Sequence, residues 1–144
     1  TGLSFFDKLS SEISKLGYNL TYYYGDREYR KYSHISNVLY SLDFFIPEIN
    51  LDIEFNGDYW HANPEVYDAN WLHPVKKVCA KDIWEYDKNR NESLKKEFGF
   101  VIYEVWEKSL TKDGNESIIL EEIIKLIKKF AKEKEMVNIN SILF

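Results

Sequence analysis

The residues best suited to chemistry are an aspartate and a glutamate on two neighbouring runs of a predicted hairpin, followed by a histidine. Asp43 lies in one apolar run, Glu54 lies in the next, and His61 follows the second. If residues 47–50 form a four-residue loop, Asp43 and Glu54 become cross-strand neighbours with Cβ atoms roughly 4.5–5.5 Å apart. Two carboxylates so placed repel each other unless a cation bridges them or one stays protonated. The pair indicates a Mg²⁺-type site; the alternative is a solvent-facing sheet side that tolerates the repulsion.

In this register one face of the hairpin is wholly apolar, and this agreement with the two-residue period of a strand supports the register. The apolar face consists of Leu42, Phe44, Ile46, Leu51, Ile53 and Phe55. The opposite face carries Asp43, Phe45, Asp52, Glu54 and Asn56.

Polar residues also interrupt the apolar stripes of two predicted helices. Glu12 falls within the stripe of the first helix, and Asp87 and Asn91 fall between the apolar positions of the second. An unpaired buried carboxylate is costly, so Glu12 is either functional or reaches water at the edge of the stripe. Asp87 and Asn91 are either an interior polar pair or an orienting group, for which His61, at a strand end, is the candidate partner.

Length and composition set the frame for these residues. The chain has 144 residues, a size that suits one domain over 1–144 without a disulfide or metal to stabilise it. The single Cys79 excludes an internal disulfide and a multi-cysteine zinc cluster. No signal peptide or apolar run long enough to span a bilayer is visible. The chain begins with Thr-Gly, so we expect a fragment of a longer protein.

The formal net charge of -5 argues at first sight against a nucleic-acid partner. However, residues 51–75 contain five acidic and no basic side chains, so the rest of the chain is neutral in sum. We therefore expect this chain alone to bind DNA weakly.

The elements that must position these residues follow from hydrophobic periodicity. We expect helices at 4–16, 79–97 and 115–134, strands at 20–24, 28–32, 38–46, 51–56 and 100–105, and a long loop over 57–77. The segment 136–144 is left as an unassigned tail. The order of helices and strands predicts an α/β (α+β) fold with a mixed sheet flanked by helices.

The hairpin residues resemble a known catalytic core. Asp43 and the run Glu54-Phe55-Asn56 resemble the D…E-x-K core of the restriction-endonuclease-like PD-(D/E)xK fold, with Asn56 in place of the lysine. The run Phe55 to His61, the pair Arg90-Asn91 and the run Val105-Trp106-Glu107 resemble the very short patch repair (Vsr) endonucleases. Closer still are the Vsr-like phage homing endonucleases with an E-D-x-H-D residue set, matched in order by Glu12, Asp43, His61 and Asp87.

This resemblance implies a metal-dependent, site-specific double-stranded DNA endonuclease of the homing type. It implies that Asp43 binds Mg²⁺, with Mn²⁺ as a substitute, together with the Glu54 carboxylate or the Phe55 backbone carbonyl. It makes His61 the general base and Asp87 the residue that orients it, while Glu12 binds a metal-linked water or a second metal. Asn56 and Asn91 support the site, and we expect no structural zinc.

The expected partner is DNA rather than a membrane, in the cytoplasm of a bacterial host for a phage-encoded enzyme. Candidate DNA contacts are Tyr59, Trp60, Lys76, Lys77, Lys81, Lys88 and Arg90, although the basic residues among them equally suit a solvated helix face. We expect a recognition module outside this chain, or a second subunit in a homodimer. Two alternatives stay open: a mismatch-nicking repair endonuclease, and a non-catalytic DNA-binding module, suggested by the missing lysine.

Overall fold

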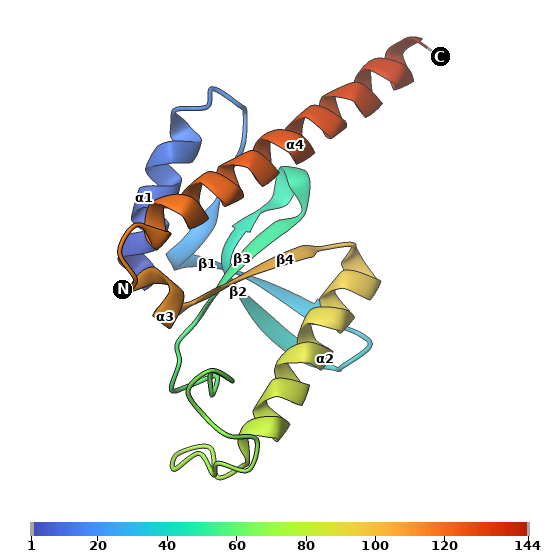
Figure 1. Cartoon of the computed structure of the whole chain (residues 1–144). Coiled ribbons are helices and arrows are strands. Elements are labelled where there is room, and N and C mark those ends of the chain that lie inside the picture. The colour runs from blue at the N-terminus through green and yellow to red at the C-terminus, as the bar shows by residue number, and fades with distance from the viewer. Residues whose placement is uncertain (1, 144) are drawn as a thin grey trace.

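The chain folds as an α+β protein with a four-stranded mixed sheet flanked by helices (Figure 1). The computed structural model describes residues 2–143, with the side chains of residues 2–135. Its elements are α1 (Gly2–Ser14), β1 (Tyr23–Ser33), β2 (Val38–Ile46), the 3₁₀ turn η1 (Pro47–Ile49), β3 (Leu51–Asn56), α2 (Ala80–Phe98), β4 (Val101–Trp106), α3 (Glu107–Leu110) and α4 (Asn115–Leu143).

The strands lie in the order β1-β2-β3-β4. Neighbours along β1, β2 and β3 are antiparallel, whereas β3 and β4 are parallel. Two parallel neighbours need a long crossover, and here the segment from Gly57 through α2 supplies it. The chain therefore returns to the sheet with α2 beside β4 (Figure 1).

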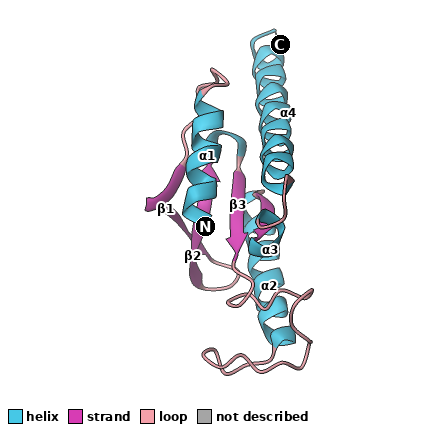
Figure 2. Cartoon of the chain, turned by 60° about the vertical axis from the view of Figure 1, so that its left-hand side comes forward, coloured by secondary structure: helices cyan, strands magenta, loops and turns pink. Residues whose placement is uncertain are grey.

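The helices cover the two faces of the sheet differently. Helices α1 and α4 pack on one face, where they lie side by side (Figure 2). Their apolar stripes bury a cluster that includes Phe5, Leu9, Phe44, Ile53 and Ile127. Helix α2 covers the other face, where Leu94 packs with a smaller cluster of strand residues.

The register of the hairpin is confirmed, but its apolar face is not continuous. Phe44 pairs with Ile53, Phe45 with Asp52 and Ile46 with Leu51. Leu42, expected beside Phe44, instead packs in the cluster under α2. The prediction is wrong at this residue because the alternation of β2 is interrupted at Asp43, next to an irregularity in the β1–β2 register.

Most predicted boundaries lie close to the observed ones, and β2 and β3 match. The two strands expected at 20–24 and 28–32 are one strand, β1, because the turn predicted at Gly25 is a bulge between Tyr24 and Tyr29. Helix α4 begins at Asn115 as predicted and continues to Leu143, so the tail 136–144 belongs to this helix as far as Leu143. The side chains of that tail lie outside the described residues.

Within residues 2–143, no helix is both long enough and apolar enough to cross a bilayer.

Candidate active site

Strands β2 and β3 change their mode of pairing at Asp43. Beyond the pair Phe44 and Ile53, backbone N–H groups donate to side chains. The amide of Asp43 donates to Glu54 Oε2 at 2.8 Å, and the amide of Phe55 donates to Asp43 Oδ2 at 2.9 Å. The expected meeting of Asp43 and Glu54 is therefore present, and each carboxylate is partly stabilised by a backbone donor.

Arg90 of α2 completes the surroundings of Glu54. Its Nη2 lies 2.9 Å from Glu54 Oε1 and donates to the Ser41 carbonyl at 2.8 Å. The Arg90 side chain is 11 % exposed, so the guanidinium is turned inward. Arg90, expected as a DNA contact, instead has its charge held in this internal ion pair.

Asp52 is a buried carboxylate that was expected only as a polar position of the hairpin. It is fully buried, and Arg90 Nη2 lies 4.0 Å from Asp52 Oδ2. Neither oxygen has a hydrogen-bond partner among the described residues. Burial, followed by the nearby negative charge of Glu54, raises the pKa of Asp52 well above its usual range. The surroundings of Asp52 therefore disfavour its ionised form relative to an aspartate in water.

Asp43 faces a small cavity at the N-terminal end of α1. The cavity is lined by Gly2, Leu3, Phe6, Gly25, Glu28, Asp43 and Phe55. Burial, and then the charge of Glu54, raises the pKa of Asp43 to about 7, while the Phe55 amide acts in the opposite direction. A cation in this cavity would relieve both effects.

Glu28 is a second carboxylate at this cavity, and the sequence analysis missed it. It lies within the bulge of β1, between Tyr24 and Tyr29, and contributes to the raised pKa of Asp43. Nothing in the periodicity of residues 20–32 indicates that a bulge would bring Glu28 to Asp43.

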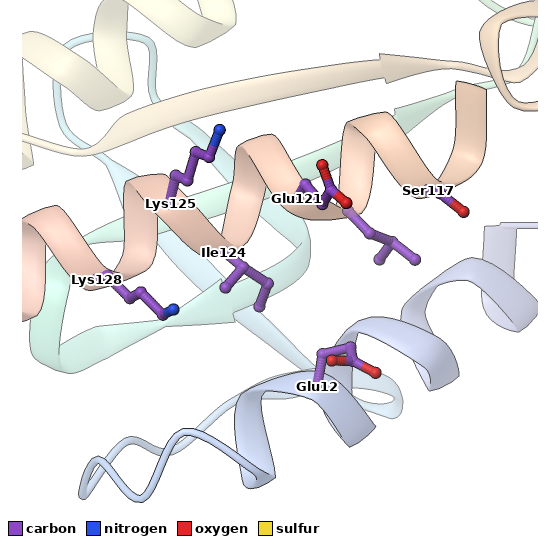
Figure 3. A pocket seen from close by; sticks show the side chains of 7 residues that line it. Glu12, Ser117, Glu121, Ile124, Lys125 and Lys128 are labelled. Carbon is purple, nitrogen blue, oxygen red and sulfur yellow. The ribbon is translucent and has the colours of Figure 1, made fainter. Parts of the chain in front are cut away.

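Glu12 does not join this site. Its carboxylate is 47 % exposed and pairs with Lys15 at 3.1 Å, so the alternative of a residue at the edge of the stripe describes it. Glu12 lines a groove between α1 and α4 (Figure 3). Leu3, which borders the Asp43 cavity, lies nine residues earlier, about 13 Å along the helix. The structure thus does not bring Glu12 together with Asp43, and the metal-linked role of Glu12 gains no support from its position.

His61 and Asp87 are brought together from a loop and a helix. Nδ1 of His61 lies 2.8 Å from Asp87 Oδ2, and the side chains are 32 % and 22 % exposed. The loop is held in place because the His61 amide bonds to the Gly57 carbonyl at 3.0 Å and Trp84 Nε1 bonds to the Ala62 carbonyl at 2.6 Å. Ala62 has a φ of 50°, a left-handed conformation that is uncommon for alanine.

Asp58, one of the five acidic residues of the segment 51–75, helps to hold this loop. The amide of Asp58 donates to Glu107 Oε1 at 3.1 Å, and Asp58 Oδ1 accepts from Asn63 Nδ2 at 2.8 Å. Glu107 ends the run Val105-Trp106-Glu107 that resembles the repair enzymes. Its contact with the Asp58 amide, which helps to hold the loop, was not predicted from the sequence.

Asn56 and Asn91, predicted to support the site, lie on β3 and α2, both beside β4. Asn56 is buried, and Asn91 Nδ2 donates to Glu104 Oε1 at 2.7 Å. Both border a hollow beside Asp87, which is lined by Asn56, Pro64, Trp84, Asp87, Lys88, Asn91, Glu92, Glu104 and Trp106.

The remaining candidate DNA contacts differ in accessibility. Trp60 is 51 % exposed, whereas the Tyr59 ring packs 4.5 Å from the His73 ring. Lys76 Nζ donates to the Trp60 carbonyl, which ties this lysine to the loop. Lys77, Lys81 and Lys88 are exposed.

The donor set allows a test of whether Mg²⁺ fits. Across the described side chains, no three His, Cys, Asp or Glu residues form a ready metal cage. Mg²⁺ uses one or two carboxylates and keeps several waters, a need that Asp43, with Glu28 across the cavity, can meet. Glu54 fits less well than expected because each of its oxygens already accepts a bond.

Comparison of the chain with protein-family models, curated proteins and solved structures finds no match. The functional interpretation therefore rests on two groups of residues. One is the Asp43 carboxylate at its cavity, and the other is His61 oriented by Asp87. Together they suit hydrolysis assisted by a cation and a general base.

Proposed function

We propose that this chain is the catalytic domain of a metal-dependent, site-specific double-stranded DNA endonuclease of the homing type. The observation that carries the proposal is the contact between His61 and Asp87 at 2.8 Å, at the end of the strand that bears Glu54. Gly57, to which the His61 amide bonds, follows Glu54 by three residues, about 10 Å of extended chain. The proposal requires that His61 and Asp43 act on the same phosphodiester.

The imidazole of His61 supplies the base. With Nδ1 as the donor to Asp87, the neutral tautomer carries its lone pair on Nε2. Nε2 takes a proton from a water, whose oxygen attacks phosphorus as the P–O bond to the leaving oxygen breaks. Asp87 then stabilises the imidazolium that forms.

Asp43 is the residue that would hold Mg²⁺, with the Phe55 carbonyl and Glu28 as further oxygen donors. When bound, the ion supplies positive charge that stabilises the negative charge on the phosphoryl oxygens. Asp43 itself contributes a carboxylate fixed by the Phe55 amide, so its orientation does not depend on the substrate.

The mixed sheet, with its acidic hairpin and an α2 crossover, is consistent with a restriction-endonuclease-like fold. Asn56 stands where that fold has its lysine, and it is buried beside the Asp87 hollow rather than at the cavity. His61 takes over the role of the missing lysine in this proposal.

Cleavage of supercoiled plasmid DNA, with Mg²⁺ or Mn²⁺, tests the proposal. We expect wild-type protein to cut, and Asp43→Asn and His61→Ala each to lower the rate by about 10²–10⁴-fold. Lys96→Ala, which removes an exposed charge from α2, serves as the matched control. Equal rates for wild type, Asp43→Asn and His61→Ala would contradict the site assignment.

Two other functions give different results in the same assay. A mismatch-nicking repair enzyme would nick T·G-mismatched duplex in preference to matched duplex. A non-catalytic DNA-binding module, which the substitution at Asn56 favours, would shift DNA in a gel without cutting it. A requirement for a recognition module or a second subunit would appear as weak DNA binding by the isolated chain.

A further inference from the structure

We infer that Arg90 is a positioning residue: it fixes the Glu54 carboxylate, which in turn holds the Asp43 backbone amide. In this role Glu54 is a bracket, a side chain that joins β2 to β3, rather than a metal ligand. The part of this inference that concerns the metal rests on the proposed function. The part that concerns the position of Asp43 stands on contacts within the chain.

The first step is the break in the sheet ladder at Asp43. Here β2 and β3 are joined by the Glu54 and Asp43 side chains. A carboxylate on a rotatable side chain is a less rigid acceptor than a backbone carbonyl. Glu54 must therefore be held by another group if it is to keep the Asp43 amide in place.

Arg90 is that group. Its Nη2 bridges the Ser41 carbonyl on β2 and Glu54 Oε1 on β3, at 2.8 and 2.9 Å. Its Nη1 donates to Asn91 Oδ1 at 2.7 Å, and its guanidinium carbon lies 5.6 Å from the centre of the Tyr40 ring. One planar cation thus ties the two strands together where their backbone pairing stops.

Burial makes this arrangement specific. The Arg90 and Glu54 side chains are 11 % and 13 % exposed, so the pair is largely shielded from water. A lysine could keep the charge but not the several fixed N–H directions of a guanidinium. With Oε1 on Arg90 and Oε2 on the Asp43 amide, both Glu54 oxygens serve the protein itself.

The experiment uses Arg90→Lys, which keeps the charge next to Glu54 and Asp52 and so favours folding. Hydrogen exchange of the Asp43 amide, followed by NMR, is the first readout, and Lys96→Ala is the control. We expect exchange at Asp43 to become about tenfold faster in Arg90→Lys while the Asp52 amide in the intact ladder stays unchanged. Exchange at Asp43 within about twofold of wild type would overturn the inference.

Calorimetric titration with Mn²⁺ is the second readout. We expect Arg90→Lys to weaken Mn²⁺ binding by about tenfold, as loss of an outer-shell partner does. Glu54→Gln and the double variant should bind Mn²⁺ equally, because both changes act through one bracket. Additive losses, or an Arg90→Lys affinity equal to that of wild type, would overturn the assignment.

The two readouts separate this inference from the proposed function. If wild-type protein binds no Mn²⁺, the proposed metal chemistry fails and Arg90 loses its role toward a metal. The exchange rate at Asp43 then still decides whether Arg90 positions that residue.

Discussion

The two faces of the sheet differ in the chemical character of the side chains that they bury. Under α1 and α4, the strands present Phe44, Ile53 and Val105 to an apolar core. Under α2, the same strands present Asp52 and Glu54 to the polar residues of a helix. One face thus supplies most of the apolar burial that stabilises the fold, while the other keeps charged groups that lower stability.

This contrast indicates which residues are present for function rather than for stability. Charges are buried under α2 at a cost that ion pairs only partly offset, and Asp52 has no hydrogen-bond partner there within the described structure. A protein that needed only to fold would not require Asp43, Glu54 and Arg90 together. We therefore expect changes at these charged residues and in the adjoining His61 loop, rather than in the apolar core, to alter chemistry more than stability.

The largest expected effect is that of His61→Ala. The rate of DNA cleavage should fall by about 10²–10⁴-fold because the general base is lost. The free energy of unfolding should change by less than about 0.5 kcal/mol, since the side chain is partly exposed. Plasmid cleavage and urea denaturation of the same sample measure both. Strong destabilisation would show that His61 serves the fold and would break the contrast between the faces.

Ile127→Ala tests the other face. Ile127 is fully buried in the cluster under α4, and its truncation should cost about 2–5 kcal/mol of unfolding free energy. At a temperature where the variant stays folded, its Mn²⁺ affinity should equal that of wild type. A folded variant with weakened Mn²⁺ binding would mean that the two faces are not separable.

These expectations also show which parts of the structure the sequence could predict. Strands β2 and β3 and their register follow from a local period-2 pattern, because a shift by one residue would expose the apolar set. The meeting of His61 and Asp87 could be anticipated because each is a polar residue beside an apolar pattern, one at a strand end and one within a helix.

Other features depend on contacts between distant residues. The spacing of apolar residues in α1 does not reveal that Glu12 lies at the edge of the apolar stripe. Nor does it reveal that Glu12 is not among the residues that line the Asp43 cavity. From the sequence alone, Arg90 is expected to be a surface charge. Its burial becomes visible only when α2 packs against β3 and Arg90 pairs with Glu54. The bulge that brings Glu28 to the cavity and the switch at Leu42 arise from pairing with β1, which no short pattern specifies.

Asp87→Asn should have a smaller effect than loss of His61. The amide no longer favours the imidazolium, so we expect a rate decrease of about 10–100-fold. Mn²⁺ affinity should stay at the wild-type value because Asp87 bonds to His61 and borders a different hollow from Asp43. Calorimetry is the check, and a large loss of affinity would make Asp87 a metal ligand.

Asp52→Asn should give the smallest effect, and one that depends on pH. The pKa of Asp52 is raised by burial and by Glu54, so the folded protein holds this proton to a higher pH than the unfolded chain does. Wild-type stability therefore falls as pH rises above the unfolded pKa of about 3.9. The melting temperature of Asp52→Asn should exceed that of wild type at pH 7 and approach it near pH 4. An excess that is independent of pH would contradict a raised pKa of Asp52.

The central claim is that Asp43, rather than any other carboxylate of the hairpin, holds the catalytic ion. Anomalous diffraction from a crystal soaked in Mn²⁺ tests it directly. We predict a peak in the cavity between α1 and β2, bonded to the Asp43 carboxylate, with Glu54 still paired to Arg90. A peak on Glu54 with Arg90 displaced, or a peak only at other carboxylates, would contradict the account.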